Sequence, residues 1–141
     1  MTQNALHPTQ AQLTAVQAQD DNAPVYMLNL LKFKERATYT DGQGMSGREA
    51  YERYAKGFTE IMTPHGVTSI YGGAILSTLI GTHAPNEAGS DWDMVALVMY
   101  PSAAKMVELT SSKAYRKIHY HRKAGLDGQI LLACNADGVF S

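Results

Sequence analysis

The stretch PVYMLNLLKF, residues 24–33, is apolar at nearly every position. Successive residues of a β-strand point to opposite faces of a sheet, so this strand presents apolar side chains on both faces. One face carries Val25, Met27, Leu31 and Phe33, and the other carries Tyr26, Leu28 and Leu30. A strand with one solvated face alternates apolar with polar residues. This pattern therefore predicts a strand that is covered on both sides, with the amide of Asn29 as the polar exception.

The segments around this strand predict an ordered set of helices and strands. Helices are expected over 7–20, from an N-cap at Ser46 to about residue 62, and over 102–126 with a break near Ser111–Ser112. Strands are expected over 67–81, 91–100 and 128–136, with the turn-rich THAPNEAGS between the first two and a bulge at Gly72–Gly73. The order is a helix followed by β-α-β-β-α-β. It predicts an α+β, ferredoxin-like split arrangement, in which helices cover one face of a four-stranded antiparallel sheet.

That arrangement leaves the second face of the sheet without helices. The strands predicted over 91–100 and 128–136 are, like residues 24–33, apolar on both sides. An apolar sheet face of this size is unusual on a monomer, and a second copy packed across a two-fold axis is its simplest cover. The sequence therefore predicts a homodimer. Residues 1–23 are expected to form a helical extension, and 24–141 a single domain.

The composition excludes several classes of protein. The 141 residues are 45% hydrophobic and 18% charged, with a formal net charge of −1, so the clustered positive charge of a nucleic-acid binder is missing. There is no apolar run of about 20 residues to span a membrane, and the N-terminus does not read as a signal peptide. The single cysteine forms no intramolecular disulfide. We expect a soluble, cytoplasmic protein.

Three residues of the last predicted helix form the sharpest candidate site. Tyr115, His119 and Arg122 stand at i, i+4 and i+7, which places them on one face of a continuous helix. A phenol, an imidazole and a guanidinium together can bind an anion and move a proton. The alternative is a helix end whose Arg forms a salt bridge across the dimer. The two-residue spacing of His119 and His121 argues against a helical metal site, and no metal is expected.

The remaining candidates are an amide and several aromatic side chains. Asn29 either orients a substrate carbonyl or hydroxyl, or makes a structural bond to a neighbouring loop or to the Gly72–Gly73 bulge. Tyr54 lies on the apolar face of its helix, as does Tyr51. Tyr71 and Trp92 lie in or near the predicted hairpin. Aromatic residues at such positions commonly belong to the core, but converging phenols can also line a ligand site.

Several segments together are similar to a known family. VYMLNLLKFK, IYGGAILSTLIG, WDMVALVMYPS, SKAY and the late Arg of YHRKAGL, spread over residues 24–137, resemble the domain of unknown function 1330 family. The resemblance implies the fold of the dimeric α+β barrel superfamily. That superfamily includes antibiotic-biosynthesis monooxygenases, chlorite-dismutase-like haem proteins, muconolactone isomerases and stress-response barrels, so the fold fixes no function. The N-terminal helix and the loop 34–46 depart from shorter members of the family.

Two functions are compatible with these patterns. The first is a small-molecule enzyme without a cofactor, an oxygenase, isomerase or lyase acting on an apolar or aromatic substrate. His119 and Arg122 would be catalytic, and Asn29, Tyr54, Tyr71, Trp92 and Tyr115 would bind the substrate. The second is a homodimer without catalysis, which binds a hydrophobic ligand or a partner protein. A ligand-sized cavity beside His119 and Arg122 would favour the enzyme.

Overall fold

The computed structural model describes residues 6–19, 22–40, 44–81 and 92–137. The expected loop at 82–90 and the N-terminal residues 1–5 lie outside these ranges. The elements in chain order are α1 (Gln10–Ala18), β1 (Val25–Phe33), α2 (Gly47–Met62), a short 3-10 helix η1 (Thr63–His65), β2 (Thr68–Ala74), β3 (Met94–Tyr100), α3 (Ala103–Thr110), α4 (Lys113–Gly125) and β4 (Leu126–Cys134).

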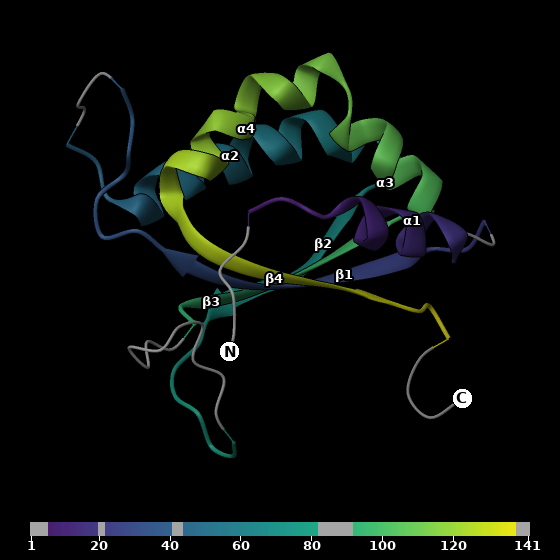
Figure 1. The fold of residues 1–141 in the computed structure, drawn as a ribbon, viewed down its shortest axis with the longest axis horizontal. Helices are drawn as coiled ribbons and strands as arrows, with labels where there is room; N and C mark the ends of the chain where they lie inside the picture. The colour runs from purple at the N-terminus through teal and green to yellow at the C-terminus, as the bar shows by residue number, and fades with distance from the viewer. Residues whose placement is uncertain (1–5, 20–21, 41–43, 82–91, 138–141) are drawn as a thin grey trace.

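The four strands form one antiparallel sheet in the order β2-β3-β1-β4. The helices lie on one side of this sheet, above it in Figure 1. This arrangement confirms the α+β fold, with the split β-α-β-β-α-β order and the additional N-terminal helix. The central strand β1 is the stretch of unusual hydrophobicity with which the sequence analysis began.

Local sequence signals set several element boundaries. The Ser46 hydroxyl accepts a hydrogen bond from the Glu49 amide, and the Glu49 carboxylate accepts one from the Ser46 amide. This capping box confirms the predicted N-cap at Ser46. The expected break at Ser111–Ser112 separates α3 from α4, and the Ser112 hydroxyl caps α4 by accepting from the Tyr115 amide. The first helix, expected over residues 7–20, is shorter in the structure, because α1 begins after the cap residue Thr9 and leaves Pro8 outside the helix.

Strand β2 differs from its prediction in two respects. It was expected to extend to residue 81, but it ends at Ala74, so residues 75–81 lie outside the sheet. The register with β3 shifts between Ser69 and Tyr71, whereas Gly72 and Gly73 pair regularly with Ala96 and Val95. The bulge thus lies before the glycine pair rather than at it.

The hydrophobic core lies between the sheet and the helices. Its centre consists of buried side chains from β1, α2, β3 and α3 and from the residue that precedes β2: Met27, Met62, Val67, Tyr100 and Leu109. Val16 of α1 packs against this cluster. The N-terminal helix therefore contributes to the same core as the rest of the chain.

The start of α2 and the end of α4 cross at two glycines. A Cβ atom on Gly47 would contact the Lys34 carbonyl oxygen and would lie 2.6 Å from the Gly125 carbonyl oxygen. A Cβ on Gly125 would lie 2.9 Å from the Tyr51 amide nitrogen. Only glycine permits backbones to approach so closely. The crossing fixes how the two helices that carry the candidate site pack together.

The described parts of the loop 34–46 are fastened to the end of α4. The Lys34 amide donates to the Gly125 carbonyl (2.8 Å), and the Thr38 amide donates to the Ala124 carbonyl (3.0 Å). Tyr39 adds a side-chain contact, because its hydroxyl lies 2.6 Å from Nδ1 of His121. These bonds hold the loop against the C-terminal turn of α4.

The second face of the sheet carries apolar side chains and no described helix. Tyr26, Leu28 and Leu30 alternate with the buried residues of β1, so they point away from the helices. The register adds their neighbours on β3 and β4, which are Val95, Leu97, Met99, Ile130, Leu132 and Cys134. We call these nine residues the open face. Leu132 is 49% exposed, and the single cysteine, Cys134, is also exposed.

Candidate functional site

A chain of polar side chains connects β1 to α4 on the helix side of the sheet. Nε2 of Gln129 donates to Oδ1 of Asn29 (2.7 Å), and Nη2 of Arg122 donates to Oε1 of Gln129. Nδ2 of Asn29 donates to the carbonyl oxygens of Met27 (3.3 Å) and Ala96 (3.2 Å). Asn29 is buried, so these bonds satisfy both its oxygen and its nitrogen. It bonds neither the loop nor the glycine pair considered in the sequence analysis.

Arg122 also faces His119 on the same helix. Its Nη1 lies 3.3 Å from Nε2 of His119, and because an arginine only donates, the histidine nitrogen accepts. Burial lowers the pKa of His119 below its ordinary value of 6.5, and the positive charges of Arg122, His7 and Lys123 lower it further. The imidazole is therefore neutral near pH 7.

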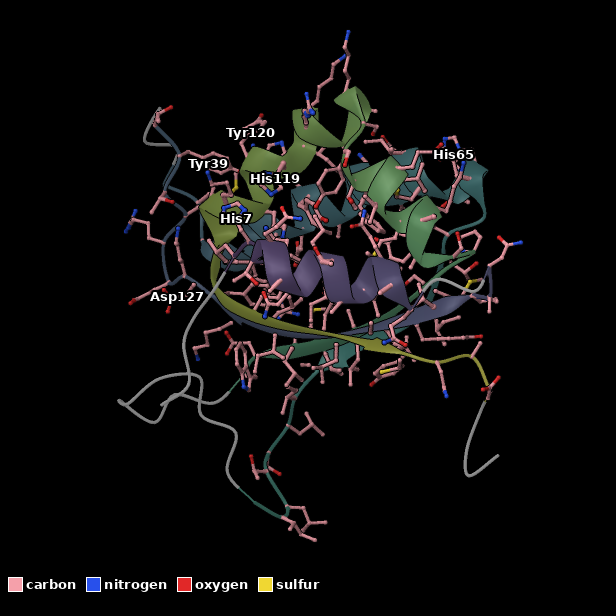
Figure 2. All side chains as sticks on the ribbon, turned by 45° about the vertical axis from the view of Figure 1, so that its right-hand side comes forward. His7, Tyr39, His65, His119, Tyr120 and Asp127 are labelled. Carbon is pink, nitrogen blue, oxygen red and sulfur yellow. The ribbon has the colours of Figure 1, made fainter. Side chains whose placement is uncertain are left out.

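The segment before α1 brings a second imidazole to this point. The rings of His7 and His119 have centroids 5.6 Å apart, and Figure 2 shows the two side by side although they come from opposite ends of the chain. His7 is exposed and His119 is half-buried. The polar chain that begins inside the protein at Asn29 thus reaches the surface beside His7.

Tyrosines from α2 and α4 border the polar chain. The hydroxyls of Tyr54 and Tyr115 are 2.9 Å apart, and their rings meet edge to face. The Tyr115 ring lies 5.6 Å from that of His119, and the Tyr51 ring lies 5.3 Å from that of Tyr54. These contacts place three phenols next to the imidazole and the guanidinium.

The buried phenols stay protonated at every ordinary pH. Burial raises the pKa of Tyr51 to about 12, and the nearby Arg122 charge opposes the rise only in part. Burial also raises the pKa of Tyr54 well above its ordinary value, and the neighbouring Tyr115 adds to the effect. These side chains can donate hydrogen bonds but do not act as bases near neutral pH.

The structure brings five of the seven predicted site residues together. Asn29, Tyr54, Tyr115, His119 and Arg122 all belong to the polar chain or border it. Tyr71 lies elsewhere, on β2, with its side chain on the side of the open face and 59% exposed. Trp92 is only 2% exposed and directly precedes Asp93, whose carboxylate accepts from the Phe33 amide (2.8 Å) and from Lys32 Nζ (3.3 Å).

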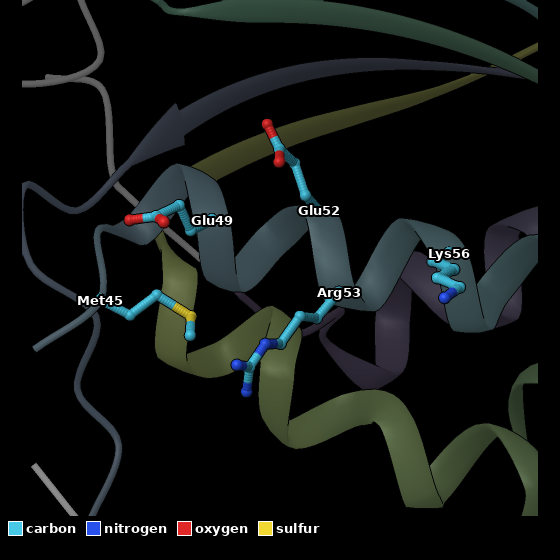
Figure 3. A pocket seen from close by; sticks show the side chains of 5 residues that line it. All are labelled: Met45, Glu49, Glu52, Arg53 and Lys56. Atoms are coloured by element: carbon cyan, nitrogen blue, oxygen red, sulfur yellow. The ribbon is translucent and has the colours of Figure 1, made fainter. Parts of the chain in front are cut away.

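A shallow depression of about 330 Å³ lies elsewhere, on the outer surface of α2. Figure 3 shows the side chains that line it, namely Met45, Glu49, Glu52, Arg53 and Lys56. It contains charges of both signs and none of the predicted site residues. In the part of the chain that the structure describes, no three His, Cys, Asp or Glu side chains are grouped to hold a metal ion. Over the same residues, no helix is long and apolar enough to cross a membrane.

Residues 44–135 match the family described as Domain of unknown function (DUF1330). This chain belongs to that family. The match is narrower than the resemblance noted in the sequence, which began at residue 24. It includes Tyr54, Tyr115, His119, Arg122 and Gln129, but the DUF1330 match begins after His7 and Asn29.

Solved structures of similar fold were found for this DUF1330 chain. Two crystal structures of RPA0582, a protein of unknown function from Rhodopseudomonas palustris, are 29% identical. The structure of the methylated protein covers 100% of both chains with a TM-score of 0.85, and the other covers 96% of this chain and 99% of that chain with a TM-score of 0.83.

A more distant structure carries a descriptive name. A protein from Bacteroides fragilis NCTC 9343, described as dimeric, of unknown function and of ferredoxin-like fold, is 6% identical. It covers 80% of this chain and 96% of that chain with a TM-score of 0.52, so it shows likeness of fold alone. A comparison with curated proteins found no match.

Sequence patterns did not point to two residues of this candidate site, Gln129 and His7. Gln129 reaches Asn29 because residues 29 and 131 pair across β1 and β4, a register that no local pattern specifies. His7 reaches His119 through the packing of the N-terminal segment. A polar residue at the start of an apolar strand was the available signal for Gln129, and nothing in the sequence singled out His7.

Proposed function

We propose that this chain is a homodimeric enzyme that acts, without a cofactor, on a small apolar or aromatic molecule carrying a negative charge. The reaction belongs to the oxygenase, isomerase or lyase classes. The observation that carries the proposal is Arg122. This half-buried guanidinium donates to the neutral groups of His119 and Gln129, and no acidic side chain among the described residues pairs with it. A half-buried cation without a carboxylate partner favours an anionic ligand.

The three reaction classes share a first step that this site can perform. Neutral His119 takes a proton from the substrate at Nε2, after the guanidinium of Arg122 turns from this nitrogen to the substrate. An N–H bond forms on Nε2, and the electron pair of the broken bond stays on the substrate. The anion formed is stabilised by the guanidinium of Arg122. The phenols of Tyr54 and Tyr115 bind the ring or donate a hydrogen bond. Tyr71 and Trp92 have no part in this step.

The alternative function is ligand binding without catalysis. It is supported by the way the site residues satisfy one another, since Asn29, Gln129, Arg122 and His119 form one bonded chain. It is also supported by the position of the described depression, which lies on the outer surface of α2 rather than at His119. A carrier would bind the same anionic molecules and return them unchanged.

The homodimer in this proposal is supported by observations that are independent of the site. The open face exposes apolar side chains on the three strands β3, β1 and β4, and a second sheet packed about 10 Å away would cover them. The Bacteroides fragilis protein of similar fold is described as dimeric. Native mass spectrometry of gently purified protein measures both the dimer and any bound small molecule.

Replacing Arg122 tests the anion site. With small aromatic carboxylates as probes and benzyl alcohol as the neutral counterpart, calorimetry should show carboxylate binding that Arg122→Gln weakens by about 30-fold, because a charge-assisted hydrogen bond is lost. Arg116→Gln is the matched control, since Arg116 is an exposed arginine of the same helix, and it should change the affinity less than twofold. Equal weakening by both substitutions, or no carboxylate binding by the wild type, would contradict the assignment.

The titration of His119 tests its electrostatic surroundings. Nuclear magnetic resonance should give His119 a pKa below 6.5, and Arg122→Gln should raise that pKa because it removes the largest charge acting on the ring. As a base, His119 must be neutral, so deuterium uptake from D₂O into a bound ligand should rise with pH through this pKa and then level off. The exchange should disappear in His119→Gln. A carrier would show the same pKa values but no exchange above the buffer rate.

A further inference from the structure

Residues 75–81, which follow β2 and belong to no helix or strand, form a segment that we call the β2 arm. Its first residue is still held beside the sheet, because the Ile75 amide donates to the carbonyl of Asp93, the residue before β3 (3.0 Å). Beyond that bond the large apolar side chains are almost bare: Leu76 is 95% exposed, Leu79 94% and Ile80 89%. No other described large hydrophobic residue in this chain approaches such exposure.

The direction of the β2 arm adds a second observation. It leaves the sheet on the side opposite the helices, below the sheet in Figure 1, which is the side of the open face. Two apolar features, the arm and the open face, therefore lie on one side of the molecule. Burying a Leu or Ile side chain is favourable, and the arm's own sheet does not bury these three.

We propose that the β2 arm lies against a second copy of this chain, with Leu79 and Ile80 buried on the partner. The proposal rests on the homodimer proposed above and adds to it a second, reciprocal contact. When two sheets pack face to face, any segment that projects from the contact side meets the other copy. An arm on the helix-covered side of the sheet would point away from the second copy and would not contact it.

The length of the arm defines how far this contact extends. Seven fully extended residues would span at most about 23 Å, and the arm spans less because it bends at residues 79–81, whereas packed sheets lie about 10 Å apart. The arm can therefore reach the partner's sheet layer beside the open face. Because the dimer is two-fold symmetric, each copy contributes one arm and receives one.

The first test measures dimer strength in the full chain. Sedimentation velocity over a dilution series should give a dimer for the wild type and a dissociation constant raised about 100-fold in L79S/I80S, since four apolar side chains per dimer lose their contacts. Ser77→Ala, a neighbouring exposed residue, is the control and should leave the constant unchanged. Leu79 and Ile80 are bare within one chain, so the double variant should keep the circular dichroism spectrum of the wild type.

The outcomes separate the two proposals. A wild type that is monomeric at all concentrations overturns the homodimer and the arm contact together. A dimer whose dissociation constant is the same in L79S/I80S overturns the arm contact and leaves the homodimer standing. Weakening confined to L79S/I80S supports both.

A cross-linking experiment identifies what the arm touches. In L79C/C134S, the exposed Cys134 is removed and a benzophenone attached to the introduced thiol reports the neighbours of the arm. Isotope-labelled and unlabelled protein are mixed and irradiated. Mass spectrometry should then detect adducts that join a labelled chain to an unlabelled one. The proposal would be overturned if every adduct formed within a single chain. It would also be overturned if adducts between chains formed only with other proteins from an added cell extract.

Discussion

Gly47→Ala should lower the free energy of unfolding by about 3 kcal/mol, measured by urea denaturation. The added methyl group would contact the Lys34 carbonyl oxygen and lie 2.6 Å from that of Gly125. Both are backbone atoms, so the chain after β1 and the end of α4 would have to move away from the start of α2. In an ordinary helix the same substitution stabilises by up to about 1 kcal/mol. The expected effect therefore has the opposite sign to helix propensity.

Gly57→Ala provides the matched comparison within the same helix. Its methyl group would lie 2.7 Å from Cγ2 of Ile118, which is a side-chain atom that can rotate away. We expect a loss of about 1 kcal/mol or less, because side-chain adjustment costs less than backbone displacement. If Gly47→Ala is neutral or stabilising, or if Gly57→Ala is the more damaging of the two, the close crossing of α2 and α4 does not hold.

Leu28→Glu should convert the proposed homodimer into a monomer, with a dissociation constant raised more than about 1,000-fold. Leu28 lies at the middle of the open face, on the central strand, with Leu97 and Leu132 as its register partners on the two sides. In a single chain a carboxylate at this position contacts water. In a dimer it would be buried without water, and this cost would apply to both copies. Sedimentation velocity measures the change.

A variant with the same added charge on the other side of the protein controls for net charge. Ala55 is exposed on α2, and Ala55→Glu should leave the dimer unchanged. The two variants differ only in which layer receives the charge. Dissociation by both, or by neither, would show that the open face is not the contact between copies.

The sequence allowed the fold to be predicted because its signals are local. The capping box of α2 lies within four residues, and the break between α3 and α4 follows from two adjacent serines. The hydrophobicity of residues 24–33 predicted a strand, and residues 25–33 form β1. Each feature depends on the residue itself and its near neighbours, so no tertiary information was needed.

The site was predictable only where it follows helical spacing. Tyr115, His119 and Arg122 are neighbours because positions three and four apart share a helix face, and the structure shows the ring contact and the bond between them. The bond from Gln129 to Asn29 instead depends on strand register. His7 depends on where the N-terminal segment packs. Neither kind of information is present in a local pattern.

Tyr71 shows how one irregularity changes the outcome for a residue. Val67 is buried in the core, and regular alternation would have placed Tyr71 on the same side, toward the helices. The register shift between Ser69 and Tyr71 reverses the alternation and turns Tyr71 toward the open side of the sheet. The glycine pair indicated a bulge in this strand, but no local pattern specified that it comes before Tyr71 rather than after it.

The same shift affects how the protein can aggregate. Strand β2 is at one edge of the sheet, where regularly spaced amide and carbonyl groups would serve as a template for a strand from another molecule. The irregular spacing at Ser69–Tyr71, followed by two glycines, makes this edge a poor template for fibril growth. Two copies that pack through their open faces bury both faces, so no third copy can add there. Strand addition at a sheet edge leaves a new free edge each time, so it can continue without limit.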